Sequence, residues 1–159
     1  MILEALLYGG IASKGESDVA IFIAEKAREA RQALYRTYTF GHAFNEARDA
    51  LMSVKNRTSQ PNWDGYGAEP VRGDTIGFAR RFLEALPPGL PGPEVGAEPD
   101  GDITFEWYKS PRRTLSVSVT ATGDLHYAAL LGPNKQYGTE AFFGEVPAPV
   151  LDLVRRIQA

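Results

Sequence analysis

The side chains in this sequence best suited to chemistry are carboxylates on separate predicted loops and strands: Asp64, Glu69, Glu106 and Glu140. Oxygen ligands from separate segments can converge on Mg²⁺ or Ca²⁺. A metal-dependent hydrolase or nuclease is therefore one function to consider. The acidic positions near Asp64 do not repeat with the spacing of a calcium loop, so we assign no metal ligand and expect no cofactor.

Asp100, Glu106 and Lys109 follow the order of acidic and basic residues found in metal-dependent nucleases. Those sites need the Glu and the Lys two residues apart, because an even spacing places both side chains on one face of a strand. Glu106 and Lys109 are three residues apart and diverge. A solvent-facing Glu106 opposite Arg112 or Arg113 in a hairpin explains the same residues.

Nucleophilic catalysis and nucleotide binding lack their usual sequence patterns. The two histidines, His42 and His126, belong to no recognisable Ser-His-Asp arrangement, and the chain has no Gly-x-Ser-x-Gly motif. No glycine-rich turn ends in Gly-Lys-Ser or Gly-Lys-Thr, which a phosphate-binding loop requires. We therefore assign no catalytic residue and expect binding rather than catalysis.

The segment 63–70, WDGYGAEP, combines two aromatic rings and two carboxylates with two glycines. This composition favours a loop, and loops often carry binding residues. We expect Asp64 to cap backbone amides in an Asx-type turn, while Gly65 and Gly67 allow the left-handed backbone that the turn needs. Trp63 then either holds the loop against the sheet or offers a contact surface.

The C-terminal module carries aromatic side chains alongside arginines, the residue types of binding hot spots. They are Trp63, Tyr66, Trp107, Tyr108, Tyr127, Tyr137, Phe142 and Phe143, with Arg112 and Arg113. Trp107 and Tyr127 lie in step with apolar strand residues, so we expect them in the core. Tyr66, Tyr108 and Tyr137 are expected at the surface, because they occupy a loop, the other strand face and the end of a turn. The candidate binding residues are Trp63, Asp64, Tyr66, Glu69, Tyr108, Arg112, Arg113 and Tyr137.

Alternation of apolar and polar residues predicts antiparallel strands over 103–108 and 115–120. A third predicted strand, 125–131, follows a turn at Thr122-Gly123-Asp124, and residues 94–97 can add a short fourth one. Consecutive strands joined by short turns pair as a meander. We therefore expect an antiparallel sheet of three or four strands.

Apolar residues at helical spacing predict helices over 74–86 and from Pro147 to near the C-terminus. Pro87-Pro88 ends the first of these helices. Sheet and helices together predict an α+β fold in which an antiparallel meander packs with helices and is preceded by an α-helical N-terminal extension.

Proline usage divides the chain, because all eleven prolines lie at or after Pro61. Residues 1–60 are rich in Ala, Glu, Lys and Arg instead. We therefore expect a helical extension or helical hairpin at 1–60 and an α+β module at 61–159.

Apolar residues at intervals of three and four predict helix over about 18–55: Val19, Ile23, Ala27, Ala30, Leu34, Phe44, Ala47, Leu51 and Val54. Thr37, Thr39 and Gly41 form helix poorly, so we expect a break there, with one kinked helix as the alternative. The apolar face needs cover. A partner, a second copy of the chain, or a hairpin folded onto the sheet would each supply it.

Composition limits the partners of the chain. A net charge of -3 and a pI near 5.4 argue against a nucleic-acid surface built on bulk charge. The chain has no cysteine, no signal-peptide pattern and no continuous apolar stretch of ~20 residues. We expect a cytoplasmic protein that engages neither nucleic acid nor membrane.

Several motifs over about 61–157 occur together: the WDGYGAEP segment, Pro99-Asp100-Gly101 with Glu106-Trp107, the LSVSV stretch 115–119, Tyr127-Ala128, the YGTE stretch 137–140 and Glu145-Val146-Pro147. As a set they resemble an uncharacterised family of bacterial proteins with no known activity. The resemblance implies a bacterial origin, a self-contained C-terminal module, and an accessory gene of a mobile element or defence locus. It implies no catalytic residue.

These observations favour a non-enzymatic bacterial protein-binding module, such as an antitoxin-like, immunity or inhibitor protein. Its partner is expected to be a protein, or a second copy bound through the N-terminal helices. Two alternatives remain. One is the metal-dependent hydrolase or nuclease that uses the four carboxylates, and the other is a small-ligand-binding protein with a pocket lined by Trp63, Trp107 and Tyr127.

Overall fold

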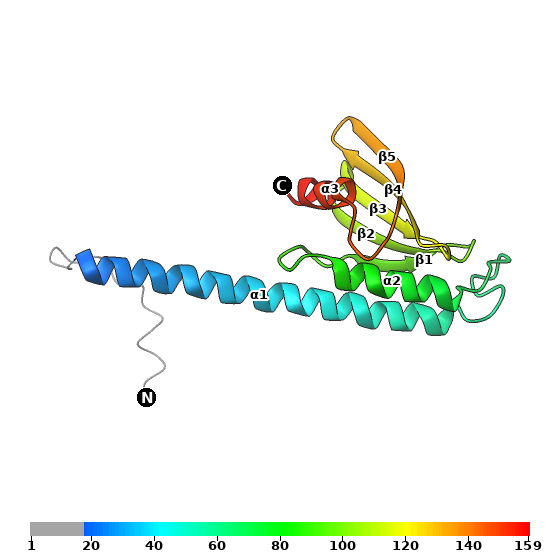
Figure 1. Ribbon diagram of the computed structural model, residues 1–159, viewed down its shortest axis with the longest axis horizontal. Helices are drawn as coiled ribbons and strands as arrows, with labels where there is room; N and C mark the ends of the chain where they lie inside the picture. The colour runs from blue at the N-terminus through cyan, green and yellow to red at the C-terminus, as the bar shows by residue number, and fades with distance from the viewer. Residues whose placement is uncertain (1–17) are drawn as a thin grey trace. The chain divides into compact units, whose positions relative to one another are not determined.

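The computed structural model describes residues 18–159, and side chains are described over 21–31 and 41–159. The elements in order are α1 (Asp18–Arg57), α2 (Gly73–Ala85), β1 (Glu94–Ala97), β2 (Ile103–Ser110), β3 (Arg113–Val119), β4 (Asp124–Leu131), β5 (Asn134–Ala141) and α3 (Ala148–Gln158) (Figure 1). The predicted α+β class is confirmed. Residues 1–17, which begin the predicted N-terminal extension, lie outside the described residues.

The sheet is a five-stranded antiparallel meander in the order β1-β2-β3-β4-β5. The prediction of three or four strands was therefore too low, because it lacked β5. This strand lies at the sheet edge and exposes most of its residues. Its sequence, NKQYGTEA, accordingly lacks the apolar alternation that marks a half-buried strand.

One face of the sheet forms the core. Ile103, Phe105 and Trp107 of β2 are buried, and alternate residues of β3 and β4 continue the same face. Phe82 of α2 stacks on Phe105 with ring centroids 5.2 Å apart. The buried residues of α3, Val150, Leu153, Val154 and Ile157, join the same cluster. Both predicted helices therefore cover this face.

The described residues show α1 as one helix through Thr37 and Gly41, so the break predicted there is wrong. Glycine and threonine cost about 1 kcal/mol or less in a helix interior, which weakens a helix without ending it. Burial of the following turns compensates for that cost. Of the predicted apolar positions, Val19 and Leu34 lie outside the residues whose side chains are described.

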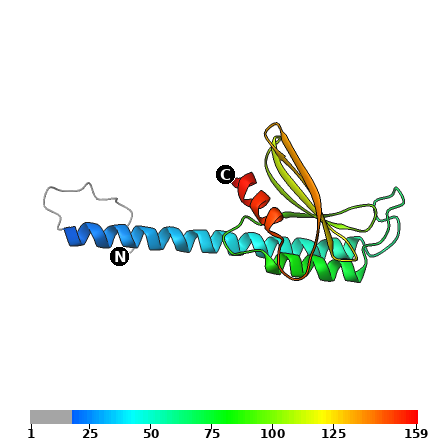
Figure 2. The ribbon, with the colours of Figure 1, turned by 45° about the horizontal axis from the view of Figure 1, so that its top comes forward.

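The chain divides into two units, Met1–Arg36 and Thr37–Ala159. The compact C-terminal unit thus begins at Thr37 rather than near Pro61, because Ala47, Leu51 and Val54 belong to the core cluster. α2 runs alongside these C-terminal turns of α1 (Figure 1, Figure 2). The change in proline content marks a change in secondary structure and not the limit of the packed unit.

Within the N-terminal unit, residues 21–31 of α1 are all exposed. They include three consecutive large apolar side chains, Ile21, Phe22 and Ile23. Lys26 and Glu29 form an ion pair at 2.7 Å one turn further along. Among the helices of residues 18–159, none has the length and apolarity needed to cross a bilayer.

Candidate functional site

The Trp63 loop between α1 and α2 is held by its own hydrogen bonds. The Oδ1 atom of Asp64 accepts from the backbone amides of Tyr66 at 2.8 Å and Ala68 at 3.0 Å. The predicted Asx-type turn is therefore confirmed. Gly65 and Gly67 have φ values of 81° and 95°, which glycine adopts without strain.

The negative charge of Asp64 is stabilised by backbone amides of this loop. The backbone amide of Tyr66 lowers the pKa of Asp64 below its ordinary value of 3.8, and the amide of Ala68 acts in the same direction. Each bond is made to the charged form of the carboxylate. Asp64 thus serves as a local cap for the loop.

Further bonds tie the loop to the rest of the unit. Trp63 donates its Nε1 hydrogen to the carbonyl of Glu69 at 2.8 Å. The amide of Glu69 donates to the carbonyl of Pro99, also at 2.8 Å. Trp63 therefore holds its own loop, and that loop is joined to the segment that enters β2.

The other group of candidate site residues lies on the sheet face opposite the core. Side chains that point this way are exposed or half-buried on all four long strands, except that of Thr104 on β2, which is buried. Within residues 37–159, α3 lies on one side of the sheet and the other side is uncovered (Figure 2). Residues 37–159 therefore form a layer of helices and a layer of sheet, and one face of the sheet is open.

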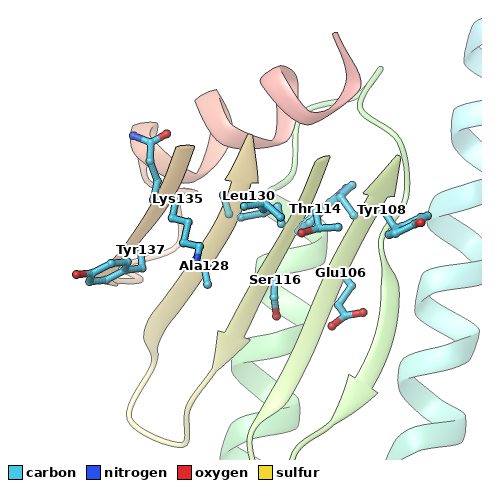
Figure 3. Close-up of a pocket in the computed structure, with 12 residues that line it drawn as sticks. Glu106, Tyr108, Thr114, Ser116, Ala128, Leu130, Lys135 and Tyr137 are labelled. Atoms are coloured by element: carbon cyan, nitrogen blue, oxygen red, sulfur yellow. The ribbon is translucent and has the colours of Figure 1, made fainter. Parts of the chain in front are cut away.

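A groove of about 480 Å³ occupies this open face, and we call it the tyrosine groove. Figure 3 shows that Glu106 and Tyr108 from β2 lie at one side of it and Lys135 and Tyr137 from β5 at the other. The floor between them comes from β3 and β4: Thr114, Ser116, Ala128 and Leu130.

Strand register explains why these side chains meet. Glu106 pairs with Ser116, Ser116 with Ala128, and Ala128 with Tyr137, so they form one row across the sheet. The next row runs through Tyr108, Thr114, Leu130 and Lys135. Small side chains at the centre of both rows leave the hollow between the larger ones.

A second hollow of about 320 Å³ adjoins the groove and shares Glu106 and Ser116 with it; we call it the acidic recess. Glu94 and Glu98 are its other acidic residues. Glu98 Oε1 accepts from the hydroxyl of Thr104 at 2.5 Å and from that of Ser118. Glu94 of β1 is the direct cross-strand partner of Glu106.

Asp102 lies beside this acidic side of the sheet. Burial raises the pKa of Asp102 above its ordinary value of 3.8, and the charges of Asp100 and Glu98 raise it further. His126 opposes the rise. Negative charge is therefore concentrated at the end of the sheet where β1 and β2 are joined.

The four carboxylates considered for metal binding lie on separate elements. Asp64 and Glu69 belong to the Trp63 loop, Glu106 faces the tyrosine groove, and Glu140 is paired with Leu125. Among the residues that the structure describes, no group of three or more histidines and carboxylates is placed to hold an ion.

The predicted binding residues fall into three places. Trp63, Asp64, Tyr66 and Glu69 share the loop, Tyr108 and Tyr137 line the groove, and Arg112 lies in the β2–β3 turn beside Arg113, the first residue of β3. Tyr66, Tyr108 and Tyr137 are exposed as expected, and Trp107 is buried. Glu106 is exposed, but it pairs with Ser116 and Glu94 rather than facing Arg112 or Arg113.

Sequence reasoning missed the groove floor, Lys135 and Glu94. The alternation in β3 identified Ser116 as a polar-face residue, but the floor position of Ala128 depends on the β3–β4 register. The three residues proposed for a small-ligand pocket have contacts of their own. Trp63 bonds within its loop, Trp107 donates Nε1–H to the carbonyl of Pro91 at 2.9 Å, and Tyr127 packs against the core.

Comparison with protein-family models, with curated proteins and with solved structures gave no significant match to this chain.

Proposed function

We propose that this chain is a non-enzymatic protein-binding module that contacts its partner through the tyrosine groove. The supporting observation is the position of Tyr108 and Tyr137, which are 60% and 83% exposed on the uncovered sheet face. Tyrosine contributes a large, rigid contact area and a hydroxyl, and it is enriched at binding hot spots. The Trp63 loop acts as a structural clasp in this proposal.

The floor of the groove supports contact with a protein surface. Ser116 and Ala128 are short, so a partner can approach the backbone of the central strands. Partner side chains can then pack between the two tyrosines with little rearrangement, since the strands fix the positions on both sides. Core residues on the other face hold those strands in place.

The biological role within this proposal is that of an antitoxin-like, immunity or inhibitor protein in a bacterium. This role is supported by the resemblance of residues 61–157 to a family of bacterial proteins. The genes of that family look like accessory genes of mobile elements or defence loci. An adjacent toxin, nuclease or phage gene would strengthen this role.

The test is affinity capture from lysate of the host organism with three versions of the chain. We expect a protein retained by the wild type and by Tyr66→Ala to be lost by Tyr108→Ala/Tyr137→Ala. Tyr66 is a matched control because it is an exposed tyrosine outside the groove. Equal capture by all three versions would contradict the proposal, and thermal denaturation must show that all three are equally folded.

A second binding mode, self-association through α1, is favoured by the exposure of Ile21, Phe22 and Ile23. Consecutive exposed apolar residues of this size are a common mark of a contact surface. Light scattering coupled to gel filtration should give a mass that rises with concentration for the wild type. Ile21→Ser/Ile23→Ser should remove the rise, whereas Glu25→Gln should keep it; a monomeric wild type at all concentrations would exclude this mode.

A further inference from the structure

We infer that the occupant of the tyrosine groove and acidic recess is an amphipathic helix of the partner that carries basic side chains. This inference rests on the proposed protein-binding function and specifies the chemistry of the partner. Four features of the open face support it: the distance between its two sides, the use of its backbone hydrogen bonds between the strands, its apolar contacts, and the distribution of charge across it.

The width of the face fits a helix. β2 and β5 are separated by two intervening strands, so their Cα atoms lie ~14 Å apart at the usual spacing of ~4.8 Å per strand. An α-helix with its side chains is about 10–12 Å across. Because Glu106 and Tyr108 stand on one side and Lys135 and Tyr137 on the other, the groove runs along the strands.

Backbone hydrogen bonding also favours a helix over an extended segment. The sheet face presents side chains, while its backbone donors and acceptors are used between the strands. An extended segment on this face would leave its own amides and carbonyls without partners, which is costly once water is excluded. A helix satisfies these groups internally.

The apolar contacts lie at the centre of the groove. Leu130 is half-buried on the floor, and Tyr108 and Tyr137 rise on opposite sides of it. The exposed methyl group of Ala128 adds to this surface. These side chains match the apolar stripe of an amphipathic helix, which presents residues three and four positions apart.

The charges select a basic helix. Glu94 and Glu106 are directly opposite each other on β1 and β2, and like charges in this arrangement destabilise a sheet. Glu98 adds a third carboxylate, and none of the residues lining the acidic recess is lysine or arginine. A lysine or arginine of the partner would supply the missing positive charge.

Lys135 makes the charge of the open face asymmetric. It lies on β5, three strands away from Glu106 on β2. Both sides are complemented by a partner helix that places its basic residues over β1 and β2. Its neutral or acidic residues then lie over Lys135 on β5. The reverse orientation would place like charges together, and such contacts are a common means of setting orientation.

The experiment uses two short amphipathic peptides of identical length, one of leucine and lysine and the other with glutamate at every lysine position. Both are titrated into the isotopically labelled full chain and followed by nuclear magnetic resonance. The Leu/Lys peptide should shift the amides of Glu94, Glu106, Ser116 and Ala128. Its affinity should fall about tenfold in Glu94→Gln/Glu106→Gln and decrease with salt. Glu145→Gln, an exposed glutamate outside both hollows, should leave the affinity unchanged.

Three results would overturn the inference: equal or tighter binding of the Leu/Glu peptide, shifts confined to the outer edge of β5, or preferential binding of oligo(dT) to the groove. The first would show that the carboxylates of the acidic recess do not select a basic partner. The second would indicate an added strand, and the third a nucleic-acid surface.

Failure of this inference can be separated from failure of the proposed function. If the host protein is still lost in Tyr108→Ala/Tyr137→Ala while the Leu/Lys peptide does not bind, the open face binds a protein of other chemistry. If capture is independent of both tyrosines, the proposed function itself is wrong.

Discussion

Gly92 lies directly against the backbone of Ala43 in α1: a Cβ atom at position 92 would be 2.6 Å from the Ala43 carbonyl oxygen. That distance is shorter than van der Waals contact, and a helix backbone cannot move aside easily. The segment that enters β1 therefore closes onto α1 only because residue 92 is glycine.

Gly92→Ala should consequently destabilise the chain by about 2 kcal/mol through overpacking. Urea denaturation measures the change. Gly96→Ala is the matched control, because a Cβ there meets no atom within 4 Å and should leave stability unchanged or slightly higher. Equal stability of the two variants would contradict the packing of Gly92 on Ala43.

Phe142 and Phe143 are neighbours in sequence with opposite environments, 5% and 93% exposed. Phe142 makes an edge contact with Phe82 at 5.9 Å between ring centroids. Phe142→Ala should cost about 3–4 kcal/mol of unfolding free energy, because it removes a buried ring. Phe143→Ala should change stability by less than about 0.5 kcal/mol; a comparable loss in both variants would contradict the burial of Phe142.

Asp64→Ala should open the Trp63 loop, since it removes the acceptor of the Tyr66 and Ala68 amides. Hydrogen exchange of those two amides should speed up, while exchange in β3 stays slow. Asp64→Asn should keep much of the protection, because an amide oxygen can accept the same bonds. Unchanged exchange in Asp64→Ala would show that the glycines and Trp63 suffice.

The lowered pKa of Asp64 also sets a pH dependence. A carboxyl whose folded-state pKa is depressed contributes stability above its unfolded pKa of 3.8 and loses it as pH falls through the lower folded value. Loop protection should therefore persist at pH 3.8 and disappear only at more acidic pH. Amide exchange of Tyr66 against pH tests this order, and loss already above pH 3.8 would contradict it.

Asp102 should behave in the opposite way. Its folded-state pKa is raised, so the favourable contribution of the protonated form is complete below 3.8 and is lost as pH rises through the folded pKa. Asp102→Asn should stabilise the chain at neutral pH by less than about 1 kcal/mol, because water screens a partly exposed charge. Urea denaturation as a function of pH measures this gain, which should vanish below pH 3.8.

Calorimetric titration with Mg²⁺, Mn²⁺ and Ca²⁺ should give no saturable binding at Asp64, Glu69, Glu106 or Glu140. Asp64 already accepts two amide bonds, and the other three carboxylates belong to the loop, β2 and β5. Binding that is lost in Glu106→Gln would support the hydrolase alternative instead.

Alternation of apolar and polar residues predicted the strands that have one buried and one exposed face. Ile103, Phe105 and Trp107 alternate with polar residues and form the core face of β2, as expected. β5 carries no such signal, because an edge strand with polar side chains on both faces has nothing to alternate. The continuity of α1 was also beyond local propensity, since packing of Leu51 and Val54 outweighs a weak stretch around Gly41.

The candidate site was predictable residue by residue, but its assembly was not. The sequence predicts Tyr108 at the surface because it lies on the polar face of a strand, and Tyr137 because it follows a turn. Their meeting in one groove depends on three successive strand registers, which link Glu106 to Ser116, Ala128 and Tyr137. A shift of one residue in any register would send one of these side chains to the opposite face.

The alternation along β2 separates two kinds of genetic change. Substitutions at Glu106 or Tyr108 change the outer surface, while Phe105 and Trp107, one residue away, keep the hydrophobic interior intact. Changes at every second strand position of β2 can therefore reshape the outer surface while the packed interior stays the same.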